Sequence, residues 1–178
     1  MSLRVNESCS KINFNNRPIY LRTDLWFGVK SGGSVGHIAG VLNNLKNHFA
    51  KLPILFSTDI IPTVSSEVIF KELEPTISFW NFSELPTLAS NFNFNTQFNK
   101  FDISDVSLIY HRYSINNFLG VYLSIKYKLP LVLEFNGSEV WISKNWGKPL
   151  KYEKISEKIE LLNLKRAKLI VVVSDPIK

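Results

Sequence analysis

Residues 18–49 constrain the fold more than any other part of the chain. Residues 18–23 form a short apolar, β-prone run, which is typical of a buried strand. A loop with two adjacent glycines follows, and apolar residues then recur at helical spacing. The apolar positions of this predicted helix are Ile38, Val41, Leu42, Leu45 and Phe49. A strand, a glycine loop and a helix in this order are the opening unit of a doubly wound α/β domain.

The loop of this unit contains Lys30, Ser31, Gly32, Gly33 and Ser34. Glycine allows a positive φ and a close approach of the backbone to a ligand. The free N–H groups of the following helical turn then suit an anion, usually a phosphate. The glycine spacing matches neither the dinucleotide fingerprint nor the P-loop. Two interpretations therefore stay open, a phosphate site and a purely structural turn.

The same alternation of strands and helices continues along the chain. Further strands are expected at 53–58, 106–111, 130–135 and 169–173, the last as a buried strand. Helices are expected on the stripes Phe118, Val121, Tyr122 and Ile125, and Tyr152, Ile155, Ile159 and Leu162. This order predicts a Rossmann-like α/β domain, with a mostly parallel sheet and helices on both faces.

Two segments do not follow this pattern. Residues 1–17 are polar, and we expect an irregular lead-in. Residues 59–100 contain three prolines and end in NFNFNTQFNK. The alternating Asn and Phe fit an amphipathic strand with its phenylalanines inward, a loop pinned by its aromatic rings, or a mobile surface patch. We assign no chemistry to this segment.

Composition excludes several classes of protein. The chain has 178 residues and 45% hydrophobic residues, which suits one globular domain with a sizeable core. Its single cysteine, Cys9, excludes an internal disulfide framework, and no zinc-type Cys/His spacing is present. The polar N-terminus is not a signal peptide, and the longest wholly apolar run, 169–173, is too short to span a bilayer. We expect a cytoplasmic protein.

The last residues predict the start of another helix. Ser174 or Asp175 suits the N-cap, and Pro176 suits the first turn. The sequence stops two residues later. We therefore expect that residues 18–178 form one domain of a longer protein, truncated before a further domain.

Taken together, these segments resemble the N-terminal domain of a GT-B fold glycosyltransferase of the family-four group. The resemblance rests on the glycine pair in FGVKSGGSVGHIAGVLNNL and on the strand ends of VSLIYHRYS, KLPLVLEFNGSE and LKRAKLIVVVSD. It is weak through 59–100. Such enzymes are retaining and transfer a sugar from a nucleotide-diphosphate sugar to an acceptor hydroxyl. Two Rossmann-like domains face each other, and the C-terminal one holds most of the donor.

The resemblance implies roles for two motifs. Lys30, Ser31, Gly32 and Gly33 match the family loop that approaches the diphosphate of the donor, which agrees with the argument from the helix N-terminus. Asn136 and Gly137 stand where many members have a catalytic His-Gly pair beside the transferred sugar. Asparagine donates and accepts hydrogen bonds but carries no proton charge, so the functional equivalence of Asn136 stays open.

The resemblance also implies the ligands. The donor sugar is a co-substrate, and neither a cofactor nor a metal is required. The acceptor is a carbohydrate or a lipid-linked molecule of surface polysaccharide or glycolipid synthesis. A domain that lacks the donor half is expected to be inactive by itself.

Polar residues at predicted strand ends are the candidates for substrate contacts. Arg112 and Glu139 follow two strands of the sheet, where α/β domains bind ligands, and Ser34 completes the set. Arg112 fits a phosphate or an acceptor carboxylate, and equally an ion pair with a nearby carboxylate. His111 is expected to be a packing residue rather than a base, and Ser174 a helix cap.

The segment 144–168 contains eight lysines and arginines against three glutamates, with Trp141 and Trp146 just before or within it. This composition fits peripheral contact with an anionic inner membrane face, and it also fits an ordinary solvated helix. No recognised nucleic-acid motif accompanies the net charge of +6, so we expect no nucleic-acid partner. The alternative function is a stand-alone, flavodoxin-like module that binds phosphate or nucleotide or has a regulatory role.

Overall fold

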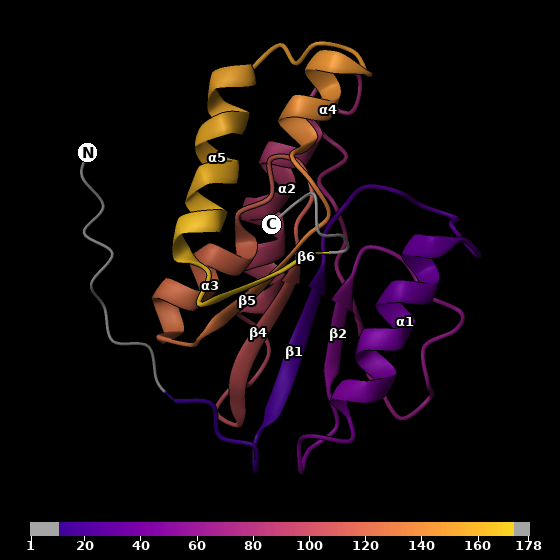
Figure 1. The fold of residues 1–178 in the computed structure, drawn as a ribbon, viewed down its shortest axis with the longest axis vertical. Coiled ribbons are helices and arrows are strands. Elements are labelled where there is room, and N and C mark those ends of the chain that lie inside the picture. Colours follow the sequence, from indigo (N-terminus) through magenta and orange to yellow (C-terminus); the bar gives the residue numbers. More distant parts are fainter. Residues whose placement is uncertain (1–10, 173–178) are drawn as a thin grey trace.

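Strands and helices mostly alternate along the chain, as the sequence predicts, although two strands and two helices follow one another directly (Figure 1). The structure is a computed structural model and describes residues 11–172. Its strands are β1 (Arg17–Arg22), β2 (Ile54–Ser57), β3 (Ile69–Glu72), β4 (Val106–Arg112), β5 (Leu131–Phe135) and β6 (Leu169–Val172). Its helices are α1 (Gly33–Leu45), α2 (Leu85–Phe98), α3 (Leu119–Tyr127), α4 (Glu139–Asn145) and α5 (Glu153–Arg166).

The described strands form one sheet in the order β3-β2-β1-β4-β5-β6. Every pair of neighbouring strands is parallel. This confirms the predicted Rossmann-like, doubly wound fold class, because the order matches the Rossmann arrangement. A flavodoxin-like sheet has the order 2-1-3-4-5, so that part of the alternative is wrong.

Alternate residues of the central strands supply the two faces of the core. In β1, Ile19 and Leu21 point toward the layer of α2 and α3, while Tyr20 points toward α1. All three side chains are fully buried. Strands buried on both faces need continuous apolar runs, which is why β1, β2, β4 and β5 were recognisable in the sequence.

The segment that ends in NFNFNTQFNK is helical, so the strand interpretation of its alternating residues is wrong. It forms most of α2, which carries Pro86 in its first turn. Asn91, Phe94 and Phe98 lie at i, i+3 and i+7 and are buried, whereas Phe92 is exposed. Asn91 fills its buried position because its amide donates to Asn116 O and accepts from Phe118 N. The buried face of α2 therefore includes a polar residue, Asn91, which forms hydrogen bonds with a loop that is distant in the sequence.

The predicted apolar stripes of α1 and α3 differ in part from the residues that are buried. Helix α1 ends at Leu45, so Phe49 lies beyond the helix, although it is buried. In α3 the side chains of Tyr122 and Ile125 are exposed, because the buried face consists of Leu119, Gly120, Val121, Leu123 and Ser124. Spacing alone did not distinguish between two overlapping stripes in this short helix.

Helix α5 packs through a largely polar stripe. Ser156, Ile159, Asn163 and Arg166 are its buried residues, whereas the predicted core residue Ile155 is exposed. The amide of Asn163 donates to Asn117 O at 2.8 Å, and Arg166 Nε donates to Ser124 Oγ at 3.2 Å. Hydrogen bonds to α3 and to its preceding loop therefore attach this helix.

Strand β6 lies at an edge of the sheet, and its burial was predicted wrongly. Leu169 and Ile170 are exposed, since β6 pairs with β5 on one side and no other described strand lies beyond it. The predicted helix start at Ser174, Asp175 and Pro176, and Cys9, lie outside the described residues. Within residues 11–172, none of the helices has the length and apolar character needed to cross a membrane.

Candidate functional site

A cavity of about 580 Å³ opens at the carboxyl edge of the sheet. Most of its lining comes from the ends of β1, β4 and β5, from the segments that follow them, and from the first turns of α1, while Ile61 after β2 and Thr87 of α2 complete it. The strand order reverses between β1 and β4, because the chain builds outward from β1 in one direction and from β4 in the other. Doubly wound domains bind their ligands at such a switch point.

Five residues proposed from the sequence line this one cavity. They come from three separate segments and are Ser34, Arg112, Asn136, Gly137 and Glu139. The four loop residues assigned to phosphate binding, Lys30, Ser31, Gly32 and Gly33, are exposed and are not part of the lining. Their assignment to a phosphate stays a prediction. Within the described residues, no group of three or more His, Cys, Asp and Glu side chains lies close enough to hold a metal ion.

The glycine loop leads into a helix whose first turn has no side-chain cap. Gly32 has φ of 118°, which a residue with a Cβ adopts only with strain. No side chain caps the N-terminus of α1, and its first turn contains no acidic residue. Ser34 brings this turn to the cavity wall. The N–H groups of the turn are thus available to an anion.

A buried carboxylate on β5, outside the lining itself, contacts two residues of the cavity lining. Glu134 is fully buried and forms an ion pair with Arg112 of the neighbouring strand β4. Its second oxygen accepts a hydrogen bond from Tyr20 Oη at 3.1 Å. The side-chain nitrogens Asn136 Nδ2 and His37 Nε2 both lie 3.3 Å from Glu134 Oε1. Burial beside this carboxylate raises the pKa of Tyr20 well above its ordinary value, so the hydroxyl remains a donor.

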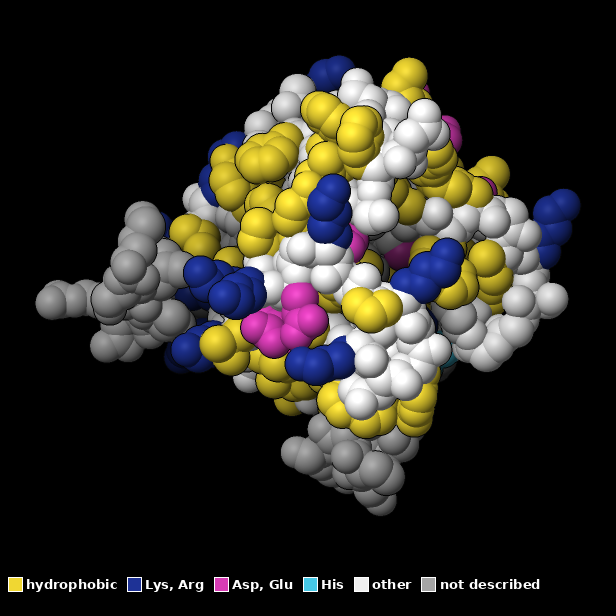
Figure 2. All heavy atoms as spheres, turned by 90° about the horizontal axis from the view of Figure 1, so that it is seen from above, with side chains coloured by type: hydrophobic (Ala, Val, Ile, Leu, Met, Phe, Trp, Pro, Cys, Tyr) yellow, Lys and Arg dark blue, Asp and Glu magenta, His cyan; other side chains and the backbone are white. Residues whose placement is uncertain are grey.

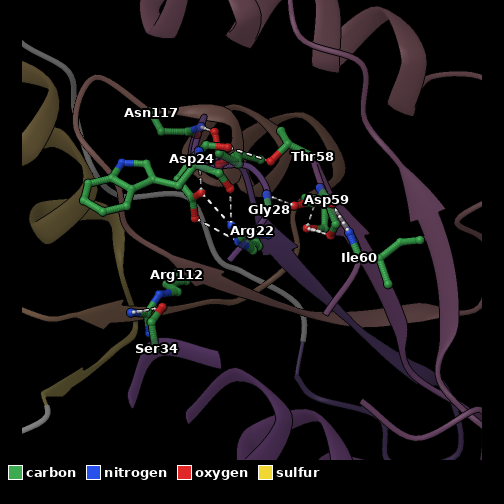
Figure 3. A network of polar contacts seen from close by, with 12 residues as sticks. Arg22, Asp24, Gly28, Ser34, Thr58, Asp59, Ile60, Arg112 and Asn117 are labelled. Atoms are coloured by element: carbon green, nitrogen blue, oxygen red, sulfur yellow. Dashed lines mark hydrogen bonds and ion pairs between the residues drawn. The ribbon is translucent and has the colours of Figure 1, made fainter. Parts of the chain in front are cut away.

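Glu134 determines how Arg112 is presented. Arg112 forms the ion pair that was one of its predicted roles, with this buried carboxylate as the partner, and its guanidinium also lines the cavity. Its Nη2 donates to Ser34 Oγ at 3.2 Å, which connects β4 with the first turn of α1 (Figure 3). Sequence reasoning missed Glu134. The available signal was a single carboxylate inside the apolar run of a predicted buried strand, where a charge needs a partner.

A second arginine, also missed, holds the loop after β1. Arg22 is 3% exposed, and its Nε and Nη2 donate to the carboxylate of Asp24 at 3.0 and 2.9 Å. Nη2 also donates to Trp26 O, so one guanidinium closes the turn (Figure 3). Thr58 Oγ1 donates to Asp24 O at 2.6 Å and ties the loop to the end of β2. Arg22 Nη1 is buried beside the cavity without a hydrogen-bond acceptor among the described residues.

Glu139 is the cavity group that can exchange a proton near neutral pH. It lies in the first turn of α4, a helix that the sequence analysis did not predict. The helix begins where Ser138 Oγ accepts from Trp141 N at 3.0 Å. Burial raises the pKa of Glu139 to about 7, and the nearby carboxylate of Asp24 acts in the same direction. A backbone N–H donated by Ile115 opposes this shift.

Asn136 and Gly137 form the turn at the end of β5. The amide nitrogen of Asn136 is used by Glu134, whereas its Oδ1 is buried at the cavity with no donor among the described residues. Gly137 has φ of 123°, so the backbone here requires glycine even though the nearest atom to an added Cβ lies 3.9 Å away. The turn thus presents the side-chain oxygen Oδ1 of Asn136 to a ligand in the cavity.

His111 does not belong to the site. It is fully buried, is not part of the cavity lining, and has its Nε2 3.3 Å from Thr23 Oγ1. Burial lowers its pKa to about 4, so the imidazole is neutral at ordinary pH. Gly120 of α3 packs directly against the ring, because a Cβ there would lie 2.5 Å from His111 Nδ1. These contacts agree with the expected packing role.

Comparison with known proteins adds no further assignment. No protein-family model and no curated protein matches the chain.

Proposed function

We propose that this chain is the acceptor-side domain of a retaining GT-B glycosyltransferase. The reaction would transfer a sugar from a nucleotide-diphosphate sugar to an acceptor hydroxyl in surface polysaccharide or glycolipid synthesis. The main support is that five residues chosen from three distant segments line one cavity at the switch point of the sheet. These residues are Ser34, Arg112, Asn136, Gly137 and Glu139. The Rossmann strand order supports the same proposal.

The charges at the cavity fit the needs of such a transfer. When the bond from the sugar to the diphosphate breaks, negative charge develops on the leaving oxygen. The uncapped N-terminus of α1 offers N–H groups at that end of the site, and Arg112 offers a guanidinium beside Ser34. Groups already fixed by hydrogen bonds stabilise such charge without reorganising, and Arg112 is fixed by Glu134.

The uncharged polar groups fit the recognition of sugar hydroxyls. The amide nitrogen of Asn136 donates to Glu134, which fixes the orientation of the side chain. Its Oδ1 has no donor among the described residues and is available to accept a hydrogen bond from a ligand. Glu139, with a pKa of about 7, would accept a hydrogen bond from the acceptor hydroxyl when ionised. The apolar lining, which includes Val35, Ile38 and Ile142, suits the carbon faces of the ligand.

The test is sugar transfer by the natural gene product, with a panel of nucleotide sugars and the variants Gly33→Val and Asn136→Ala. An added Cβ at Gly33 meets no atom within 4 Å, so the variant should fold. We expect each substitution to lower transfer at least about tenfold. The matched control is Gly40→Ala, which lies on the same helix and also meets no atom within 4 Å. Full activity of both site variants would contradict the proposal.

A stand-alone phosphate- or nucleotide-binding module is the second candidate. It is favoured by the uncapped first turn of α1 and the exposed glycine loop before it. Tight nucleotide binding by the 178-residue chain, together with no sugar transfer by the natural gene product, would favour this candidate over the transferase.

A further inference from the structure

All four tryptophans of the chain are exposed at one end of the molecule. Trp26 follows β1, Trp80 lies between β3 and α2, and Trp141 and Trp146 lie in α4 and at its end. Because the strands are parallel, these segments emerge together at the carboxyl edge of the sheet. The exposed fractions of the four side chains are 73%, 49%, 50% and 78% in chain order. Tryptophan is highly buried on average, so this concentration needs a physical reason.

These rings form part of one apolar surface around the cavity, which we call the aromatic rim. It consists of Trp26, Phe27, Phe79, Trp80, Trp141 and Trp146. The rings of Phe27 and Trp80 lie 6.1 Å apart, and those of Trp141 and Trp146 lie 4.9 Å apart. Trp26 and Ile142, which neighbours Trp141, both line the cavity, so each half of the rim borders it. A concentration of exposed aromatic rings of this kind marks an interaction surface.

Exposed lysines accompany the aromatic rim. Lys30 lies on the same loop as Trp26, and Lys148 and Lys151 follow α4. Figure 2 looks onto this end of the molecule and shows hydrophobic side chains with Lys and Arg side chains between them, together with a smaller group of Asp and Glu side chains. The chain as a whole carries a net charge of +6. The surface therefore combines exposed indole rings with positive charge.

Several acidic side chains of the same segments are engaged within the protein. Asp24 accepts from Arg22, and Glu84 accepts from the backbone N–H groups of Lys151 and Tyr152 at 2.6 and 2.9 Å. Glu139 faces the cavity and is protonated in part at neutral pH. Glu74 stays exposed where the segment after β3 begins. The positive charge near the rim is thus only partly balanced.

We propose that the aromatic rim docks on the surface of an anionic phospholipid bilayer. Indole rings favour the headgroup level of a bilayer, where one part of the ring is apolar and the N–H stays wet. Each lysine near an anionic leaflet adds attraction that falls off within a Debye length. In this orientation the mouth of the cavity faces the headgroups. The docking surface is independent of the chemistry in the cavity, so it stands or fails separately from sugar transfer.

The test is flotation of the 178-residue chain with vesicles of phosphatidylglycerol and phosphatidylcholine, compared with vesicles of phosphatidylcholine alone. We expect binding to the anionic vesicles that weakens as salt is added. Because all four tryptophans lie at this end, their intrinsic fluorescence should shift to the blue on binding and should be quenched by brominated lipid. Equal binding to both vesicle types, or no binding to either, would overturn the proposal.

Matched variants locate the contact. We expect Trp80→Ser combined with Trp146→Ser to lower the partition coefficient at least about tenfold. Leu161→Ser, at an exposed position of α5 away from the carboxyl edge, should leave it unchanged. Lys148→Glu should weaken binding to anionic vesicles, whereas Lys100→Glu, which follows α2 at the opposite edge, should not.

Three outcomes would count against this surface. Equal losses in the rim and control variants would assign binding to net charge rather than to the rim. Retained binding by the rim variants would assign it to another face. Concentration-dependent dimers that the rim substitutions abolish, without vesicle binding, would identify a second copy of the chain as the occupant. Circular dichroism of every variant keeps unfolding separate from lost binding.

Discussion

Removing the buried carboxylate of Glu134 should lower the free energy of unfolding by more than its ion pair with Arg112 contributes. Glu134→Leu leaves the guanidinium of Arg112, whose side chain is 16% exposed, without its partner. It also leaves the buried Tyr20 hydroxyl without its acceptor. Breaking one side of a buried pair costs about 3–5 kcal/mol, and orphaning a buried hydroxyl costs about 1–3 kcal/mol. Because Arg112 is partly exposed, we expect the lower part of the summed range, a loss of about 4–5 kcal/mol in the free energy of unfolding.

A double-mutant cycle with Arg112→Met separates the pair from its surroundings. We expect the single Arg112→Met variant to lose about 3 kcal/mol, because Glu134 keeps the hydrogen bond from Tyr20. The double variant removes both charges, so its loss should fall short of additivity by at least about 2 kcal/mol. The protein should still fold, since domains of this size have about 5–15 kcal/mol of stability.

Urea unfolding followed by far-ultraviolet circular dichroism measures all four corners of this cycle, with the m value as a check on two-state behaviour. The matched control is the surface pair of Lys46 and Glu67, for which we expect no resolvable coupling. Additive losses at Glu134 and Arg112 would refute the reasoning, because they would show that neither charge depends on the other for its burial.

The remaining predictions concern the packing of His111 and the proton on Glu139. Gly120→Ala should cost about 1–3 kcal/mol, because its Cβ would lie 2.5 Å from His111 Nδ1. Gly40→Ala meets no atom within 4 Å and should be neutral or stabilising in the same thermal melts, and equal effects would contradict the packing argument. The pKa of His111 is lowered from 6.5 to about 4 by burial, so between these values the unfolded chain binds more protons. Stability should therefore fall as the pH drops from about 6.5 toward 4, and His111→Gln should flatten this dependence if the ring is responsible. The pKa of Glu139 is raised from 4.5 to about 7, so the folded chain binds more protons in that window and stability should fall as the pH rises through it. Glu139→Gln should then be more stable than the parent at pH 8 by about 1 kcal/mol and not at pH 4; an unchanged difference across pH would show that Glu139 does not titrate near 7.

The fold class could be predicted from the sequence because buried parallel strands need continuous apolar runs. The runs at β1, β2, β4 and β5 are local features, and each was recognised with nearly its observed bounds. Strand β3 was missed because it is short and half-exposed, so its residues IFKE carry no such run. Helix α2 was missed because Asn91 occupies a buried position that a sequence pattern counts as polar.

The location of the cavity also followed from the sequence, since residues after parallel strands meet at one edge of a sheet. Arg112 and Glu139 were found in this way, Asn136 was found through the family resemblance, and all three line one space. The partners of these residues were not predictable. Glu134 and Arg112 are 22 residues apart in the chain, and Tyr20 is 114 residues from Glu134, so their contacts depend on strand order and register.

The sequence by itself thus determined five of the six described strands, a mostly parallel sheet, and which edge carries the polar residues. Tertiary structure alone decided which charges are paired, which carboxylate has its pKa raised by burial, and that all four tryptophans share one end. The physical reason is that apolar periodicity reports burial within a few neighbouring residues. Ion pairs, desolvation and surface patches depend on atoms brought together from distant segments, and no local pattern in the sequence records which distant segments meet.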